Sequence, residues 1–255
     1  MREILVTTSN PFGTYSRYYN LLYREKNYAA EVDYVHALLS RHGLKGKELL
    51  ELGSGTGKHG HLLAERGYCV TGIERSAEMV AHAEPSSGFS CMQGDIRTVR
   101  LSRSFDAVLA LFHVMGYQVK NEDIQAVFKR TSEHLRPGGL FVFDVWYSAA
   151  VYAQRPAVKI KRVEDSDWTI TRIAEPVVYL AENRVDVRYT IHAQDRHSGT
   201  CQEHVETHPV RHFSQPELDL LATGAGFERL AAEEFLTGAT PSADTWGICQ
   251  VLRRI

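Results

Sequence analysis

The chain has 255 residues, of which 44% are hydrophobic, so it can bury one sizeable core and a small appended layer. Its formal charge of -2 gives no general attraction to phosphate backbones, which argues against nucleic acid as a substrate. The four cysteines are far apart, no charged-then-apolar leader opens the chain, and no apolar run approaches the ~20 residues of a membrane helix. We therefore expect a cytoplasmic protein with free thiols and no membrane segment.

Residues 12–28 are dense in tyrosine and poor in aliphatic side chains. Tyr19, Leu22 and Tyr23 recur at helical spacing, so one face of a helix could pack on the domain. Two interpretations stay open for this segment: a surface helix with aromatic anchors, or a lid over a ligand. A second helical stripe runs from Val32 to Leu39 and ends at Gly43.

A glycine turn follows the first buried strand, which we expect at residues 48–52. Gly53, Gly55 and Gly57 alternate directly after it, and a helix pattern begins near His61. Such glycines allow positive φ and let a ligand approach the backbone, while the helix N-terminus offers unpaired N–H groups. The dinucleotide fingerprint fits only in the shifted frame Gly55, Gly57, Gly60.

The unshifted pattern, an acid at Glu51 followed by Gly53, Gly55 and Gly57, resembles motif I of the class I S-adenosylmethionine (SAM)-dependent methyltransferases. This resemblance implies that SAM lies across the glycine turn. No metal is expected.

Acidic residues end the next two strands as well. Glu74 closes the strand at 68–74, about 20 residues past the first glycine, where a carboxylate can accept ribose hydroxyls. Asp95 follows the strand at 89–93, and the resemblance implies that it accepts the adenine amine while Ile96 packs near the ring. A helix-start acid and a turn aspartate are the alternatives, but the ordered set with Glu51 favours SAM over NAD. The family likeness extends the expected cofactor contacts to Arg75 and Phe112.

The fourth strand, 105–111, leads into His113 and Tyr117. Ligands of open parallel sheets sit just beyond the strand C-termini, so both side chains are candidates for chemistry and acceptor binding. A helix from Asn121, as its N-cap, to Leu135 and a fifth strand ending at Trp146 follow.

In residues 148–212 the pattern changes to strands in which apolar and polar residues alternate, so that one face of each strand is exposed to solvent. This predicts an inserted antiparallel β layer that binds the substrate. His204, His208 and His212 recur at even spacing and would share a strand face. Metal binding is disfavoured because no cysteine or acid completes a zinc spacing and Pro209 disturbs the strand. A face turned to a substrate cleft is the preferred interpretation.

The last segment predicts a helix capped by Ser214, a strand from Phe227 to Leu236, and a final strand from Trp246 to Arg253. The expected fold is an α/β, Rossmann-like, mostly parallel seven-stranded sheet with helices on both faces. We divide it into a lid segment (1–30), a SAM-binding core (31–147), the inserted layer (148–212), and a helix and hairpin that complete the core sheet (213–255).

A closer resemblance is to N-methyltransferases that act on nucleotide-linked aminodeoxysugars. It rests on Tyr15 with Ser16, on Tyr23, Lys26 and Tyr28, on Trp146 two residues after Asp144, and on Glu206-Thr207-His208. The resemblance implies that Tyr15 lies by cofactor and substrate, that Tyr23 and Lys26 help to hold SAM, and that Trp146 and His208 contact the acceptor.

Methyl transfer needs an acceptor lone pair in line with the methyl group, and an ammonium must first lose a proton. His113 is the first candidate base and His208 the second, with Tyr15 or Tyr117 orienting the acceptor. The group that this chain resembles can carry a histidine where Tyr117 follows Gly116, so the identity of the base stays open.

Other functions remain as alternatives: O-methylation of a sugar or small natural product, an NAD-binding oxidoreductase, and a SAM-binding protein without catalysis. The sequence leaves open the acceptor atom, the number of methyl groups and the oligomeric state, a homodimer included.

Overall fold

The computed structural model describes residues 5–9 and 15–255 of the chain. These residues form two compact units. The larger unit contains Asn27–Gln154 and Arg211–Ile255, and the smaller one combines the N-terminal part up to Lys26 with Arg155–Val210. Each unit is described here by itself.

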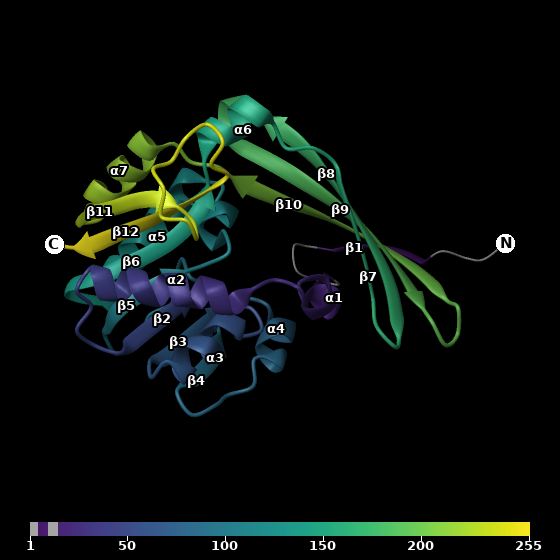
Figure 1. Ribbon diagram of the computed structural model, residues 1–255, viewed down its shortest axis with the longest axis horizontal. Coiled ribbons are helices and arrows are strands. Elements are labelled where there is room, and N and C mark those ends of the chain that lie inside the picture. Colours follow the sequence, from purple (N-terminus) through teal and green to yellow (C-terminus); the bar gives the residue numbers. More distant parts are fainter. Residues whose placement is uncertain (1–4, 10–14) are drawn as a thin grey trace. The chain divides into compact units, whose positions relative to one another are not determined.

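The larger unit is built on a seven-stranded sheet with the order β11-β12-β6-β5-β2-β3-β4 (Figure 1). Its strands are β2 (Glu48–Leu52), β3 (Cys69–Glu74), β4 (Phe89–Gln93), β5 (Phe105–Ala110), β6 (Leu135–Trp146), β11 (Phe227–Glu234) and β12 (Gly247–Arg254). The strands β2 to β6 pair in parallel, whereas β12 is antiparallel to both β6 and β11. This confirms the predicted fold class.

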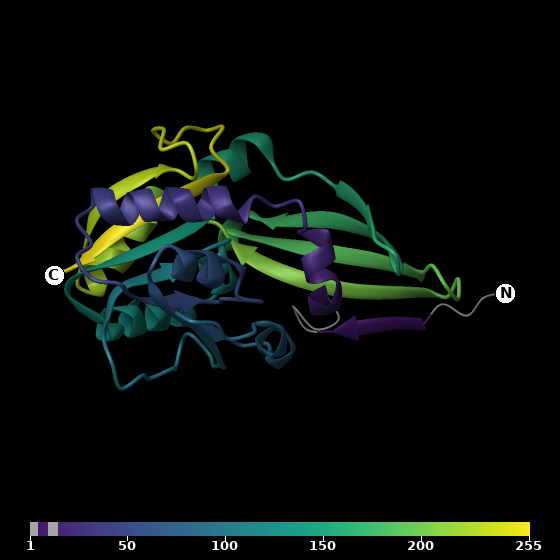
Figure 2. The ribbon, with the colours of Figure 1, turned by 60° about the horizontal axis from the view of Figure 1, so that its bottom comes forward.

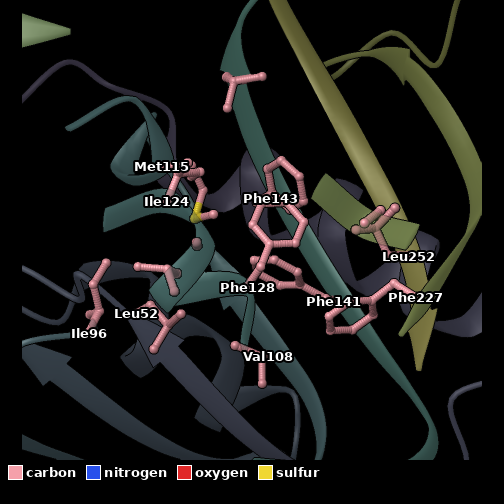
Figure 3. Packing of buried hydrophobic residues seen from close by; sticks show 14 of the residues in the cluster. Leu52, Ile96, Val108, Met115, Ile124, Phe128, Phe141, Phe143, Phe227 and Leu252 are labelled. Carbon is pink, nitrogen blue, oxygen red and sulfur yellow. The ribbon is translucent and has the colours of Figure 1, made fainter. Parts of the chain in front are cut away.

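Alternate residues of the strands point to opposite faces of the sheet, and each face has its own helices. Leu49 packs with α2 (Tyr28–Arg41) and α3 (Lys58–Glu65), whereas Leu50 packs with α5 (Asn121–His134) and α7 (Gln215–Gly224). Figure 3 shows the second of these cores, in which the rings of Phe128, Phe141 and Phe143 lie together. A doubly covered sheet of this kind holds its strand ends at fixed positions, and the candidate site lies at those ends.

The remaining elements of the larger unit are short. They are α4 (Ala77–His82), the 3-10 turn η1 (Val114–Tyr117) and α6 (Ser148–Gln154). Among the described residues, no helix is both long enough and apolar enough to cross a membrane.

The smaller unit is a five-stranded sheet with the order β1-β10-β9-β8-β7 (Figure 2). Its strands are β1 (Leu5–Ser9), β7 (Lys159–Glu164), β8 (Trp168–Tyr179), β9 (Arg184–Asp195) and β10 (Cys201–Arg211), with the turn η2 (Leu180–Glu182) between β8 and β9. The helix α1 (Tyr15–Leu22) packs Tyr18 and Leu22 against Ile170 and Ile191 of this sheet.

Several local features differ from the sequence predictions. β1, which pairs in parallel with β10, was not predicted at all. Asn121 is the first residue of α5 and Lys120 is its N-cap, while Ser214 caps α7 without a side-chain hydrogen bond. β11 ends at Glu234 rather than at Leu236, because Leu236 has a φ of 73°, which ends an extended strand.

Candidate cofactor and acceptor site

The glycine turn after β2 has the backbone that its sequence predicts. Gly53, Gly55 and Gly57 have φ values of 67°, 56° and 79°, where other residues are strained. A Cβ on Gly53 would lie 2.5 Å from Val114, and one on Gly57 would lie 2.6 Å from the Phe89 ring. At Gly55 the nearest atom would be 3.9 Å away, so the turn is open there and a ligand can approach the backbone.

Glu74 at the end of β3 faces this turn. Its two carboxylate oxygens accept the backbone N–H groups of Gly55 (3.0 Å) and Ser76 (2.8 Å). The side chain is buried, whereas the neighbouring Arg75 is exposed. These two hydrogen bonds fix the carboxylate beside the open part of the turn, with acceptor capacity left for a hydroxyl.

Asp95 follows β4 and is paired with an arginine that the sequence prediction missed. Arg97 binds both oxygens of Asp95, at 2.6 to 3.1 Å, and also reaches Asp123 at 2.9 Å. The hydrogen bonds from Arg97 hold the pKa of Asp95 below its usual range. Asp95 is therefore an ionised acceptor, next to the buried side chain of Ile96.

Glu51 is the most deeply buried of the three acids, with 1% of its surface exposed. Burial raises its pKa to about 8, and the charge of Glu74 adds to the effect, while the Gly60 N–H opposes it. Its Oε2 atom has no hydrogen-bond partner of good geometry within residues 5–9 and 15–255. A buried acceptor of this kind beside an open glycine turn suits a ligand with a positive charge or a hydrogen-bond donor.

The chain after β5 is strained and anchored to a single carboxylate. Phe112 and His113 have φ values of 65° and 63°, which only a well-supported backbone keeps in non-glycine residues. Their N–H groups donate to Asp144 at 2.6 and 3.2 Å, and Nδ1 of His113 lies 2.7 Å from Oδ2 of the same carboxylate.

Asp144 is buried, whereas 28% of the His113 side chain is exposed. Burial alone would raise the pKa of Asp144, but the charge of His113 and the hydrogen bonds from His113 and Phe112 outweigh it, so the pKa is lowered. Asp144 therefore holds the backbone of Phe112 and His113 through two N–H groups and lies in ion-pair contact with Nδ1 of the His113 ring.

A cavity of about 360 Å³ lies beside His113. Trp146 and Trp246 form its aromatic walls, with ring centroids 6.2 Å apart, and the Trp146 ring meets the His113 ring edge-on at 6.1 Å. Glu234 and Asp244 line it as well, so the cavity offers both apolar faces and negative charge. Of these lining residues the sequence had pointed only to His113 and Trp146.

Several predicted site residues belong to the smaller unit. The backbone of Tyr15 begins α1, but its side chain lies outside the described residues. Tyr23 packs on Tyr19, with centroids 4.7 Å apart, and its hydroxyl accepts from Arg172 at 3.2 Å. Lys26 is half-buried at the end of the turn that follows.

His208 is buried on β10, with Nε2 3.2 Å from the Glu206 carboxylate and the ring edge-on to Tyr189 at 4.9 Å. Tyr189 and Tyr23 both lie under the guanidinium of Arg172, at 5.1 and 5.8 Å. The face of this sheet therefore gathers aromatic, basic and acidic groups around His208. Arg172 had no sequence signal beyond its charge.

The evenly spaced histidines are divided between the two units. His204 and His208 belong to the smaller unit, whereas His212 lies in the larger one and is hydrogen-bonded to Ser148 at 2.8 Å. Within the part of the chain that the structure describes, no three histidine, cysteine or acidic side chains meet in a metal-binding group. Tyr117 is half-buried at the end of η1.

Known proteins resemble this chain in sequence and in fold. A family model described as a methyltransferase domain matches residues 49–139. The dTDP-3-amino-3,4,6-trideoxy-alpha-D-glucopyranose N,N-dimethyltransferase of Streptomyces venezuelae is 31% identical over 82% of this chain and 87% of its own length. The dTDP-3-amino-3,6-dideoxy-alpha-D-glucopyranose N,N-dimethyltransferase of Streptomyces fradiae is 29% identical over 91% and 90%.

Solved structures agree with this. Streptomyces venezuelae DesVI is 27% identical, with a TM-score of 0.78 over 92% of this chain and 97% of its own. SAM-bound CalS10 from Micromonospora echinaspora, an amino pentose methyltransferase, is 25% identical, with a TM-score of 0.75 over all of both chains. The strand-end acids, the open glycine turn and these relatives lead to one conclusion: the chain belongs to the class I SAM-dependent methyltransferases, and SAM is its cofactor.

Proposed function

We propose that this enzyme methylates the amino group of a nucleotide-linked aminodeoxysugar. The observation that carries the proposal is the reach of the likeness to two aminodeoxysugar N,N-dimethyltransferases. It extends over 82% and 91% of the chain, well beyond the 49–139 segment that matches the general methyltransferase domain. The added length includes residues 148–212, where we propose that the acceptor binds.

The cofactor contacts fall on the strand ends. We assign SAM to the turn of Gly53, Gly55 and Gly57, with Glu74 for the ribose and Asp95 with Ile96 for the adenine. The open space at Gly55 and the unpartnered Oε2 of Glu51 support this fit. SAM supplies an electrophilic methyl group on a positively charged sulfonium, and the chain supplies the positioning. Arg75, Phe112, Tyr15, Tyr23 and Lys26 remain proposed as further contacts.

For the acceptor, His113 is the preferred base. Asp144 occupies its Nδ1, so Nε2 is the ring nitrogen that can take a proton from a sugar ammonium. Trp146 and Tyr117 would position the sugar beside it. His208 stays the second candidate, and its Nε2 lies 3.2 Å from the Glu206 carboxylate.

The smaller unit has features that suit the nucleotide end of the acceptor. Lys161 and Arg172 are direct partners across β7 and β8, and both lie over the Tyr23 ring. Like charges opposite each other cost stability, which a bound diphosphate would offset.

The test is a matched pair of acceptors that differ in one atom. Purified enzyme is incubated with SAM and a dTDP-3-amino-3,6-dideoxyhexose, and in parallel with the sugar that carries a hydroxyl at that carbon. We expect S-adenosylhomocysteine to form with the amine only. Formation with the hydroxyl sugar alone would instead establish an O-methyltransferase, and formation with neither would refute the substrate class.

The cellular setting follows from the same proposal. We place the enzyme in the cytoplasm, where its four unpaired cysteines would stay reduced. A homodimer remains a prediction, which light scattering of the purified protein tests.

A further inference from the structure

Three buried ionisable side chains from different elements meet beneath the glycine turn. Glu31 of α2, Glu51 of β2 and His59 of α3 have 8%, 1% and 6% of their surfaces exposed. Nε2 of His59 lies 2.7 Å from Oε2 of Glu31, and Nδ1 lies 3.7 Å from Oε1 of Glu51. The Tyr28 ring closes the group edge-on to His59, at 5.0 Å.

We assign the tautomer of His59 from its contact with Glu31. An ionised carboxylate can only accept a hydrogen bond, so Nε2 of His59, 2.7 Å from Glu31, carries the proton. Nδ1 is then the basic nitrogen of the ring, and it is the one that faces Glu51. Its distance of 3.7 Å is about 1 Å longer than a hydrogen bond, so a small shift of either side chain closes it.

Burial and the charge of Glu74 on the neighbouring strand oppose an ionised Glu51, whereas the Gly60 N–H favours it. Cys91 lies on the strand beyond Glu74, and Nδ1 of His59 lies 3.7 Å from the Glu51 carboxyl. Since burial and Glu74 raise its pKa to about 8, Glu51 mostly holds a proton at pH 7. A protonated carboxyl cannot neutralise a positive ligand, so binding SAM at Glu51 requires that this proton go elsewhere.

We infer that His59, oriented by Glu31, receives the Glu51 proton when SAM binds. The proton moves from the Glu51 carboxyl to Nδ1 of His59, which leaves an ionised Glu51 facing the cofactor and an imidazolium held by Glu31. No proton leaves the protein in this step. His59 and Glu31 are therefore positioning residues that set the charge of Glu51. The inference rests on the proposed contact between Glu51 and SAM.

Calorimetry in two buffers of different ionisation enthalpy tests it, because it counts the protons released on binding. At pH 7.0, His59→Gln should release about one more proton per SAM than the wild type, since a group with a pKa near 8 is about nine-tenths protonated there. Its affinity should fall about tenfold at pH 7.0 and about thirtyfold at pH 6.5, since each pH unit changes the ionised fraction tenfold. The titration of SAM itself cancels in these ratios.

Two further variants serve as a control and as an independent test. His61→Gln on the same helix is the matched control, because His61 contacts Ser86 rather than the acids, and it should release no extra proton. Glu31→Gln keeps His59 but removes the carboxylate that stabilises its imidazolium, so it should shift proton release in the same direction as His59→Gln.

Opposite outcomes separate the inference from the proposed cofactor site. If Glu51→Gln binds SAM as tightly as the wild type, Glu51 does not contact the cofactor and the site assignment itself fails. If Glu51→Gln weakens binding but His59→Gln releases no additional proton and shows the same loss at both pH values, the site stands and the proton transfer is refuted. His59 and Glu31 would then only join α3 to α2.

Discussion

Asp144→Asn removes the charge to which the strained chain after β5 is anchored. The wild-type carboxylate accepts two backbone N–H groups and lies 2.7 Å from Nδ1 of His113. The amide keeps a single acceptor oxygen. Loss of the charge-assisted contacts should lower the free energy of unfolding by about 2–3 kcal/mol. The 3–5 kcal/mol typical of a broken buried pair is an upper limit, because the His113 side chain is partly exposed to solvent.

For a chain of this size that loss corresponds to a fall in melting temperature of roughly 4–12 °C. The pH dependence has a fixed sign. The folded-state pKa of Asp144 is lowered, so its stabilising effect is present above the ordinary carboxyl pKa and is lost as pH falls through the folded value. The difference in unfolding free energy between wild type and variant should therefore shrink in acid, which urea titrations from pH 7 to pH 3 measure.

Measuring kcat distinguishes a loss of catalytic geometry from a loss of stability alone. Without Asp144 the His113 ring loses its orientation, so we expect kcat to fall about a hundredfold or more, the usual worth of a positioned base. Asp106→Asn is the control: that carboxylate accepts from the Glu48 N–H and pairs with Arg136. It lies near the start of β5, whereas His113 follows the end of that strand. Equal kcat losses in the two variants, or an unfolding difference that persists unchanged in acid, would refute the reasoning.

Two further predictions concern the backbone turn and a buried histidine. Gly57→Ala should lower the free energy of unfolding by about 2–4 kcal/mol, because the new Cβ overlaps Phe89 and the backbone is strained at a positive φ. Gly43→Ala, at a similar φ but in open space, should lower it by about 1–2 kcal/mol, and urea unfolding compares the two variants. Burial lowers the pKa of His212 to about 4, so stability should decline as pH falls from about 6.5 towards 4, because the unfolded chain binds the extra proton. His212→Gln should flatten that decline in urea titrations, and an unchanged slope would assign it to other groups.

Much of this fold could be predicted from local sequence patterns. The sequence pattern located the strands of the core sheet because most of them contain an apolar run bounded by glycine, proline or acidic residues. Gly53, Gly55 and Gly57 could be assigned to a turn because a positive φ has a strong residue preference. The acids at strand ends followed from one geometric rule, that parallel strands end at the same edge.

The remaining features depend on contacts between distant residues. β1 pairs in parallel with β10, which is distant in the sequence, and Thr7, Thr8 and Ser9 leave it without the apolar pattern of a buried strand. His113 and Asp144 are 31 residues apart and meet because two adjacent parallel strands end together. Glu234, Asp244 and Trp246 line the cavity from the last two strands and the loop between them. The course of that loop cannot be predicted from a local sequence pattern.

The central claim is that the acid at the end of β3 holds the cofactor, and titration calorimetry with SAM tests it most directly. Glu74→Gln is compared with Glu84→Gln, an exposed acid on the following loop. Loss of a charged hydrogen-bond acceptor of about 1.5–3 kcal/mol should weaken SAM binding roughly 10- to 100-fold in the first variant and leave the second unchanged. Wild-type affinity in Glu74→Gln would contradict the account and move SAM away from the strand ends.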